Sequence, residues 1–316
     1  MKKALLQIHL AVVLWGFTGV LGRAIHMDYA VLVWYRMALT AIFMAVILCY
    51  RRQWVRIPAR DLGNLALIGC LMALHWVAFY GSIKLANASI ALICLSTASI
   101  FTSLLDPFVN KGKHDLGELF IGFLALLGVY FIYQSQQAFS IGIIFGVISA
   151  ILSSIFTMLN KRMANSYPAR TMVFYEMATG FLMITLLLPF YLAAFPGTGL
   201  WPNQGSIAGL FTGTHSLAGH NDWIWLIILA LCCTVWAQSL ALNALKYISS
   251  FTATLSVNLE PIYGMALAFL FFNENKELTP GFYGGMALIC FSVVLQTVRV
   301  LRFKAGYVKE RGGIGE

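Results

Sequence analysis

The sequence predicts an all-α polytopic membrane protein with ten transmembrane helices, arranged as two inverted five-helix repeats. Three observations lead to this fold class. Hydrophobic residues make up 60% of the 316 residues and charged residues only 10%, too few charges to cover the surface of a water-soluble domain. The apolar residues gather in runs of about 20, the length that crosses a bilayer. Basic residues occupy the connectors between these runs asymmetrically.

Ten apolar runs each predict one transmembrane helix. Their approximate ranges are 5–25, 30–50, 62–82, 88–108, 116–134, 140–160, 171–195, 223–243, 249–272 and 280–300. The runs are long and lack a period of two, which favours helices over barrel strands. No clear small-residue cleavage site ends the first run, so we interpret it as a retained span and not as a signal peptide.

The distribution of basic residues predicts the orientation in the membrane. A cytoplasmic N-terminus places most of the 21 Lys and Arg residues on the cytoplasmic side, leaves Arg23, Lys84 and Lys276 outside, and puts Arg36 within a span. The positive-inside rule therefore predicts a multi-pass protein of the cell (inner) membrane with both termini in the cytoplasm. The net charge of +9 is then an orientation signal helped by anionic lipid, and no nucleic-acid partner is expected.

Self-similarity divides the chain into two halves. A shift of 140 residues aligns Val33-Trp34-Tyr35-Arg36-Met37-Ala38 with Val173-Phe174-Tyr175-Glu176-Met177-Ala178, and a shift of 162 aligns Lys84 with Lys246 and Gly122 with Gly284. The predicted halves are 1–139 and 140–302, with an outer connector insertion at 196–221 and a basic cytoplasmic tail at 303–316. Five spans per half invert the second half, an architecture typical of secondary transporters with a midplane site.

Several short segments, in their order along the chain, carry a family resemblance. They are Leu14-Trp15-Gly16, Tyr35-Arg36, Ala244-Leu245-Lys246-Tyr247, Glu260-Pro261 and Asn273-Glu274. Together with the repeat, they resemble the EamA-type permeases of the drug/metabolite transporter superfamily over about residues 5–300. The resemblance implies alternating access around a central cavity but no particular substrate. Two departures are visible: Ala98-Ser99 stands opposite Glu260-Pro261, and Gly112 stands opposite Glu274.

Polar residues within the spans are the candidates for a site. A charge near the bilayer centre costs about 2.5–3.5 kcal/mol on insertion scales, and Glu260 falls about halfway along the ninth span on a polar stripe. The predicted substrate-binding or coupling residues are Glu260, Ser256, Asn258, Tyr263, His75, Trp76, Trp236, Gln238, Ser96 and Trp15. The alternative is structural: a buried acid satisfied by a neighbouring helix, a hydrogen-bonded histidine and serines that pack helices. Arg36, expected near the outer end of its span, favours a local structural network.

These features predict a secondary transporter of a small neutral, zwitterionic or cationic, amino-acid-like metabolite, with a proton as candidate coupling ion. The charges predicted within the spans are Asp106, Glu176 and Glu260 against Arg36 alone, which disfavours an anion. A nucleotide-sugar or other anion carrier of the same superfamily stays open, as does a passive channel. An intramembrane enzyme lacks its motifs, so no catalytic residue is expected. The cysteines lack the spacing of a metal site, and no cofactor is expected.

Overall fold

The computed structural model describes residues 2–110, 116–196, 198, 222–248, 253, 256–257 and 259–312. Within these ranges the regular structure is entirely helical. The first half contains α1 (Lys2–Ala24), α2 (Tyr29–Tyr50), α3 (Ala59–Leu85), α4 (Ala88–Ser96), α5 (Ala98–Asn110), α6 (Leu116–Ser135) and η1 (Gln137–Phe139). The second contains α7 (Ser140–Met163), α8 (Ala169–Ala194), α9 (Asp222–Ala230), η3 (Leu231–Trp236), α10 (Ala237–Leu245), α12 (Glu260–Phe272), η4 (Glu274–Lys276) and α13 (Pro280–Gly312).

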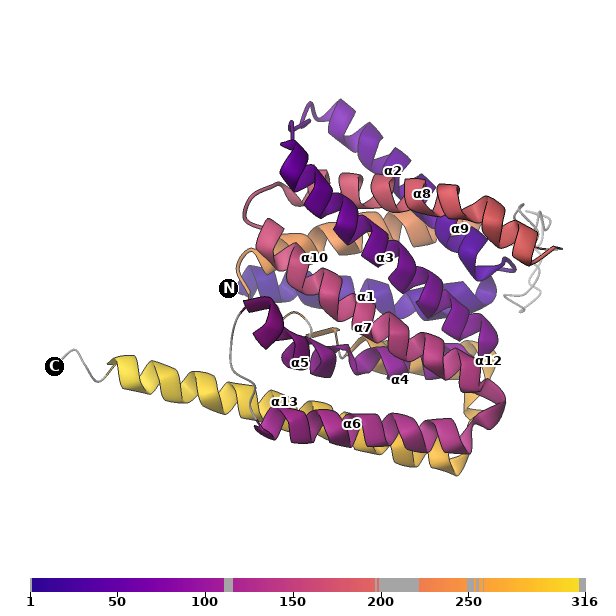
Figure 1. Ribbon diagram of the computed structural model, residues 1–316, viewed down its shortest axis with the longest axis vertical. Helices are drawn as coiled ribbons and strands as arrows, with labels where there is room; N and C mark the ends of the chain where they lie inside the picture. The colour runs from indigo at the N-terminus through magenta and orange to yellow at the C-terminus, as the bar shows by residue number, and fades with distance from the viewer. Residues whose placement is uncertain are drawn as a thin grey trace.

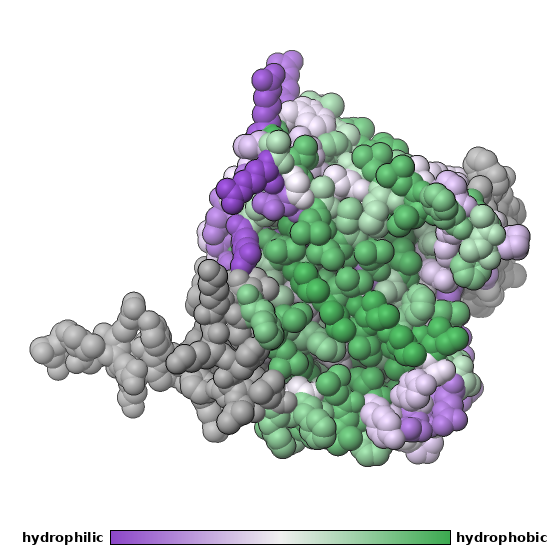
Figure 2. Space-filling view, in the orientation of Figure 1, coloured by the Kyte–Doolittle hydropathy of each residue, from purple (hydrophilic) through white to green (hydrophobic). Residues whose placement is uncertain are grey.

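The helices have the lengths and composition of membrane spans. Seven helical segments in the described ranges are long and apolar enough to cross a bilayer, and three shorter apolar helices cover Phe120–Ser135, Glu260–Phe272 and Pro280–Leu295. A broad hydrophobic band covers the face seen in Figure 2, and hydrophilic residues gather at its two edges. The structure is thus consistent with a polytopic membrane protein; the count of ten spans and the inversion of the halves stay predictions.

The helix bundle is organised around three packing groups. α3 packs along both α7 and α8, α1 packs along α10 and α12, and α6 pairs with α13 at one edge of the bundle (Figure 1). The start of α1 and the far end of α13 lie on the same side (Figure 1). α13 continues to Gly312, past the end near residue 300 expected from hydropathy.

Two interruptions break the regular helices near the centre of the bundle. At Thr97, between α4 and α5, the side-chain hydroxyl donates to the carbonyl of Cys94 at 2.6 Å, a local bond that competes with the regular helical ladder. The segment η3 is a π-helix between α9 and α10. There the Thr234 hydroxyl donates to the carbonyl of Leu229 at 2.9 Å. π-helical turns frequently mark functional positions.

Small residues allow α1 to approach its neighbours closely. A side chain at Gly16 would collide with Tyr263, while Gly19 faces Leu92 and Gly22 faces Tyr80. Glycines at this three-residue spacing therefore form a close-packing face of α1. At Gly16, the backbone of α12 lies directly against α1 beside Glu260.

Candidate functional site: a central cavity with two unpaired charges

A cavity lies in the centre of the bundle among α1, α2, α3, α7, α10 and α12. Its volume is about 90 Å³. It is lined by Ile8, Trp15, Thr18, Arg36, Met72, His75, Trp76, Phe79, Leu95, Ala98, Ser153, Phe156, Thr157, Asn160, Gln238, Ala241, Leu242, Leu245, Ala253, Val257 and Glu260. Mostly apolar walls with a few convergent polar groups are typical of small-molecule sites.

Glu260 is the acidic residue of the cavity. It is the first residue of α12, with Pro261 directly after it in the first turn, where proline is tolerated. The positive end of the helix dipole favours a carboxylate at this position. The side chain is only 5% exposed, and it makes no hydrogen bond or ion pair with any residue in the described ranges.

Arg36 is the basic residue of the cavity. It lies in the first half of α2, is 1% exposed and lines the cavity, and it holds a local network of the kind expected from the sequence. Its Nη1 donates to the hydroxyl of Tyr80 at 2.7 Å, and its Nε donates to that of Thr234 at 2.9 Å. The guanidinium also stacks on the Trp76 ring, with 3.7 Å between Cζ and the ring centroid, a cation–π contact.

The guanidinium of Arg36 keeps unused hydrogen-bonding capacity. A third bond runs from Nη2 to the backbone carbonyl of Cys233 at 3.4 Å. Arginine carries five N–H donors, so two remain after these three bonds. All three partners are neutral, and Arg36 forms no ion pair with a described acidic residue, Glu260 included. The cavity thus holds one buried cation and one buried anion that attract each other without forming a direct ion pair.

His75 is held in place from one side of its ring. Its Nδ1 lies 2.9 Å from both the hydroxyl and the carbonyl oxygen of Ser149. The ring also packs edge-on against Phe156, with 5.3 Å between centroids. These contacts match the structural alternative for this histidine, although the residue also lines the cavity.

The structure brings together part of the predicted site. Trp15, His75, Trp76, Gln238 and Glu260 line the cavity. The remaining residues do not lie on it: Ser96 and Ser256 are buried outside the lining set, and Tyr263 and Trp236 are 41% and 62% exposed. Asn258 and nearly all of the 196–221 connector lie outside the described residues, and the side chain of Asp106 is likewise not described.

The π-helix explains the position of Trp236. From the sequence, this residue is among the predicted substrate-binding or coupling residues. A π-turn accommodates an extra residue, which rotates the following side chains relative to a regular helix. Trp236 ends the segment η3 and faces outward, whereas Gln238 reaches the cavity. The same segment supplies the Thr234 hydroxyl and the Cys233 carbonyl to Arg36.

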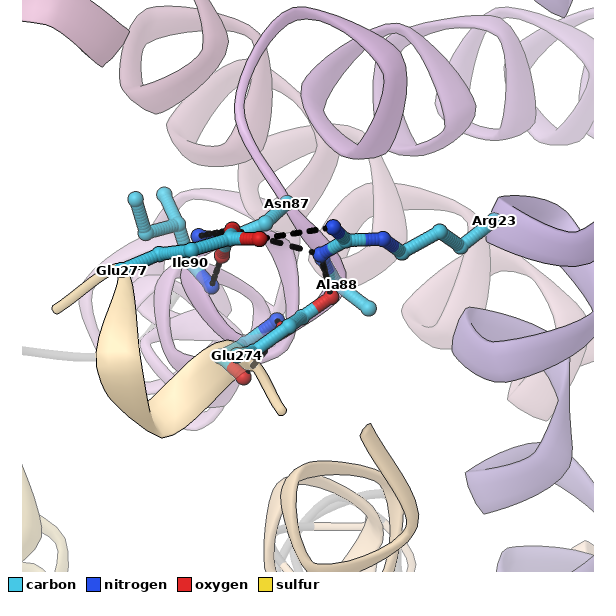
Figure 3. Close-up of polar contacts among 7 residues, drawn as sticks. Arg23, Asn87, Ala88, Ile90, Glu274 and Glu277 are labelled. Atoms are coloured by element: carbon cyan, nitrogen blue, oxygen red, sulfur yellow. Dashed lines mark hydrogen bonds and ion pairs between the residues drawn. The ribbon is translucent and has the colours of Figure 1, made fainter. Parts of the chain in front are cut away.

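A second polar cluster lies at the C-terminal end of α1. Glu274 accepts hydrogen bonds from the backbone N–H groups of Ala88 at 3.1 Å and Ser89 at 2.8 Å, at the start of α4. Arg23, near the end of α1, forms ion pairs with Glu274 and Glu277 (Figure 3). Asn273 adopts a left-handed backbone with φ of 54°, which ends α12 and turns Glu274 toward α4. We call Arg23, Glu274 and Glu277 the α4 latch.

The latch and the cavity lie toward different ends of the bundle. The cavity lining includes Ile8 near the start of α1, and Asn160 and Leu245 near the ends of α7 and α10. These positions are on the side that carries the chain's N-terminus, opposite the latch (Figure 1). The latch also connects α1 and α4 of the first half to the segment between α12 and α13 of the second.

Comparisons with known proteins identify the family. The profile of the EamA-like transporter family matches residues 2–134 and 140–298. An uncharacterized transporter of Archaeoglobus fulgidus is 24% identical over 231 residues, covering 73% of this chain and 74% of that protein. The uncharacterized transporter YxxF of Bacillus subtilis is 22% identical over 298 residues, covering 90% of this chain and 88% of that protein.

The fold has a counterpart among solved structures. A crystal structure superposes with a TM-score of 0.63 at 14% identity, covering 96% of this chain and 99% of that chain. This similarity shows a shared fold and, at such identity, nothing about substrate. The family profile, in contrast, covers most of the chain. The chain is therefore a member of the EamA-like transporter family, within the drug/metabolite transporter superfamily.

Proposed function

We propose that this protein is a secondary transporter of the cell membrane that moves a small zwitterionic metabolite by alternating access. The observation that carries the substrate class is a pair of opposite buried charges on one cavity, Arg36 and Glu260, with no direct ion pair between them. A buried charge that lacks an ion-pair partner is costly even where neutral groups contact it, as they contact Arg36. A substrate with a carboxylate and an ammonium group would neutralise both charges at once: the carboxylate at the free N–H donors of Arg36 and the ammonium at Glu260.

The balance of charge separates this substrate from its alternatives. A purely cationic substrate would pair with Glu260 and leave Arg36 unpaired. A nucleotide sugar or other anion would pair with Arg36 and place its charge beside the Glu260 carboxylate, unless that group carries a proton. Each alternative leaves one more uncompensated charge than a zwitterion does. Protonation of Glu260 in the absence of substrate would couple transport to a proton.

The packing of the bundle supports a two-half mechanism. The two segments matched by the family profile, 2–134 and 140–298, coincide closely with the predicted halves 1–139 and 140–302. In the predicted repeat, α1 corresponds to α7, α3 to the α9–α10 span, and α6 to α13. The contact between α3 and α7 therefore has a symmetric counterpart in the contact between the α9–α10 span and α1, and α6 packs against its own counterpart α13. Inverted halves of this kind rock about a midplane site in secondary transporters.

The described conformation fits one state of such a cycle. The cavity extends toward the termini side, where the sequence predicts the cytoplasm, while the α4 latch ties the two halves together on the opposite side. We infer a state that is closed on the outer side. Family membership favours a transporter over an enzyme, and saturable counterflow in liposomes would distinguish a carrier from a passive channel.

A ligand series on the purified protein tests the substrate class. Compounds with identical carbon skeletons are compared as the zwitterion, the amine lacking the carboxylate and the acid lacking the amine. We expect only the zwitterion to raise the melting temperature strongly, because ligand binding stabilises the folded state by mass action. The Glu260→Gln variant should bind the zwitterion about 10- to 100-fold more weakly than wild-type protein does, since a charged hydrogen bond contributes about 1.5–3 kcal/mol. Its affinity for the zwitterion should then be similar to its affinity for the acid that lacks the amine.

A control exists in Glu176→Gln, which changes another fully buried glutamate that does not itself line the cavity and contacts it through the lining residue Asn160. This variant should keep the preference for the zwitterion. Arg36→Lys should retain the cationic charge but bind less tightly, because lysine lacks the planar fork that pairs with a carboxylate. If the acid alone binds wild-type protein best, the anion-carrier alternative holds. If Glu260→Gln preserves discrimination between zwitterion and acid, the role of Glu260 is wrong.

A further inference from the structure

A surface groove runs along α2 and α10, separate from the central cavity. Its volume is about 580 Å³, and its lining residues are Met44, Val46, Ile47, Tyr50, Arg51, Arg170, Val235, Trp236, Ser239, Leu240 and Asn243. α2 and α10 each pack against α8, and the groove lies between them. Its walls are mostly apolar along the span, and they end at Arg51 of the α2 C-terminus and Arg170 of the α8 N-terminus.

A second pocket continues the groove past the helix ends. Arg170 and Asn243 line both hollows, and the second adds Arg52, Trp54 and Lys246 in a volume of about 560 Å³. Together the two form one feature, the α2–α10 groove, with a long apolar part and a basic end. Trp54, at the basic end, is 47% exposed, and tryptophan is enriched where a protein meets the lipid headgroup region. Trp236, 62% exposed, belongs to the apolar part of the groove.

The basic end of the α2–α10 groove has no acidic counterpart. Neither hollow includes an Asp or Glu among its lining residues. Arg170 donates to the side-chain oxygen of Gln53 at 3.0 Å, and Arg51, Arg52 and Lys246 form no ion pair with any acidic residue in the described ranges. Four cations therefore gather where the two hollows meet, with no ion pair to a described acidic residue, a charge pattern complementary to a phosphate group.

We propose that the α2–α10 groove is a binding site for one anionic phospholipid. The phosphate lies among Arg51, Arg52, Arg170 and Lys246, and an acyl chain follows the apolar wall toward Trp236 and Leu240. Basic pockets between transmembrane helices bind anionic headgroups in this way. The continuous apolar wall favours a lipid over a free phosphate, because a soluble anion would use only the basic end. The lipid would bridge α2 and α10, which belong to different predicted halves.

Lipid binding to the full-length protein, measured by native mass spectrometry, tests the site. Purified protein is titrated with phosphatidylglycerol or with phosphatidylcholine of identical acyl chains. We expect wild-type protein to retain one phosphatidylglycerol molecule preferentially. In the double variant Arg51→Gln/Arg170→Gln, its affinity should fall about 30-fold, since each basic residue near an anionic surface contributes roughly a fivefold gain. Arg51→Lys/Arg170→Lys should bind nearly as well as wild type.

The matched control is Arg56→Gln/Arg60→Gln, which removes two exposed positive charges near the same end of the bundle but outside the α2–α10 groove. This variant should bind phosphatidylglycerol like wild type. Leu240→Trp keeps every charge and fills the apolar wall, so it should also weaken lipid binding. The proposal is overturned if phosphatidylcholine binds equally well, if the two glutamine variants behave alike, or if inorganic phosphate alone displaces the retained lipid.

Discussion

Glu274 offers the sharpest test of how the two halves are tied together. The side chain is fully buried and accepts three hydrogen bonds from α4, from the N–H groups of Ala88 and Ser89 and from the Ser89 hydroxyl at 2.5 Å. It also forms an ion pair with Arg23. Glu274→Gln keeps the size and one acceptor oxygen but removes the negative charge. We predict that this change loosens the α4 latch and exposes the start of α4.

The size of the effect follows from the contacts. A hydrogen bond to a charged group contributes about 1.5–3 kcal/mol and a neutral one about 0.5–1.5 kcal/mol, so each bond weakens by about 1 kcal/mol. Arg23 is partly exposed, so its ion pair is screened and adds little. Three bonds therefore lose about 3 kcal/mol in total. The equilibrium between the latched and open states should shift about 150-fold toward the open state.

Hydrogen exchange measures this shift at the affected atoms. The amides of Ala88 and Ser89 lose their charged acceptor, and their exchange from the native state reports local opening. We expect faster exchange in peptides that cover the start of α4 in Glu274→Gln, and unchanged exchange where α6 pairs with α13. Glu277→Gln is the matched control, because Glu277 is 37% exposed and its carboxylate accepts no bond from these two amides.

Two outcomes would contradict the reasoning. One is unchanged protection of the α4 amides in Glu274→Gln, which would mean that the carboxylate does not hold this helix. The other is equal acceleration in Glu274→Gln and Glu277→Gln, which would assign the effect to the charge of Arg23 and not to the capping bonds.

Two packing predictions follow from the same structure. Gly69→Ala should lower the melting temperature clearly, because a Cβ at this position of α3 would collide with the α8 backbone. The control is Gly63→Ala on the same helix, where a Cβ meets nothing within 4 Å, so this change should be neutral or stabilising by up to about 1 kcal/mol. Equal effects of the two changes on the melting temperature would refute the close approach of α3 and α8. Thr234→Val should destabilise by about 1–3 kcal/mol, because it leaves the buried Nε of Arg36 without its acceptor; Thr40→Val, whose hydroxyl only donates to a carbonyl of its own helix, should cost less in the same unfolding measurement.

The helical spans could be predicted because their signals are local. Span length, apolar composition and capping residues act over one helix at a time, so the expected ranges agree with the helices to within a few residues for most spans. Asp28 and Asn87 accept bonds at the starts of α2 and α4, as N-cap residues do. The π-helix could not be predicted in this way, because no pattern of apolar or capping residues in the sequence marked the segment Leu231–Trp236.

The candidate site was only partly predictable for the same reason. Glu260 stood out because an acid within an apolar run is costly, and no contact information was needed to select it. Arg36 is equally buried, but its depth and partners depend on Tyr80, Trp76 and Thr234 from two other spans. Hydropathy placed it near the outer end of its own helix and so suggested a structural role. One signal was available: a single basic residue within a span, in a chain whose other cations lie in connectors.

The two halves differ in sequence at the position of the latch glutamate. Glu274 stands opposite Gly112 in the sequence repeat; Gly112 itself lies outside the described residues. Glycine has no carboxylate, so the equivalent residue of the first half cannot cap the start of a helix in the second. On the termini side the two halves are joined by hydrogen bonds from the Tyr167 hydroxyl to Asp61 at 2.5 Å and from Arg170 to Gln53 at 3.0 Å. On the opposite side the latch adds an ion pair and three capping bonds to one buried carboxylate, so releasing it through Glu274→Gln should change the resting state without changing the cavity.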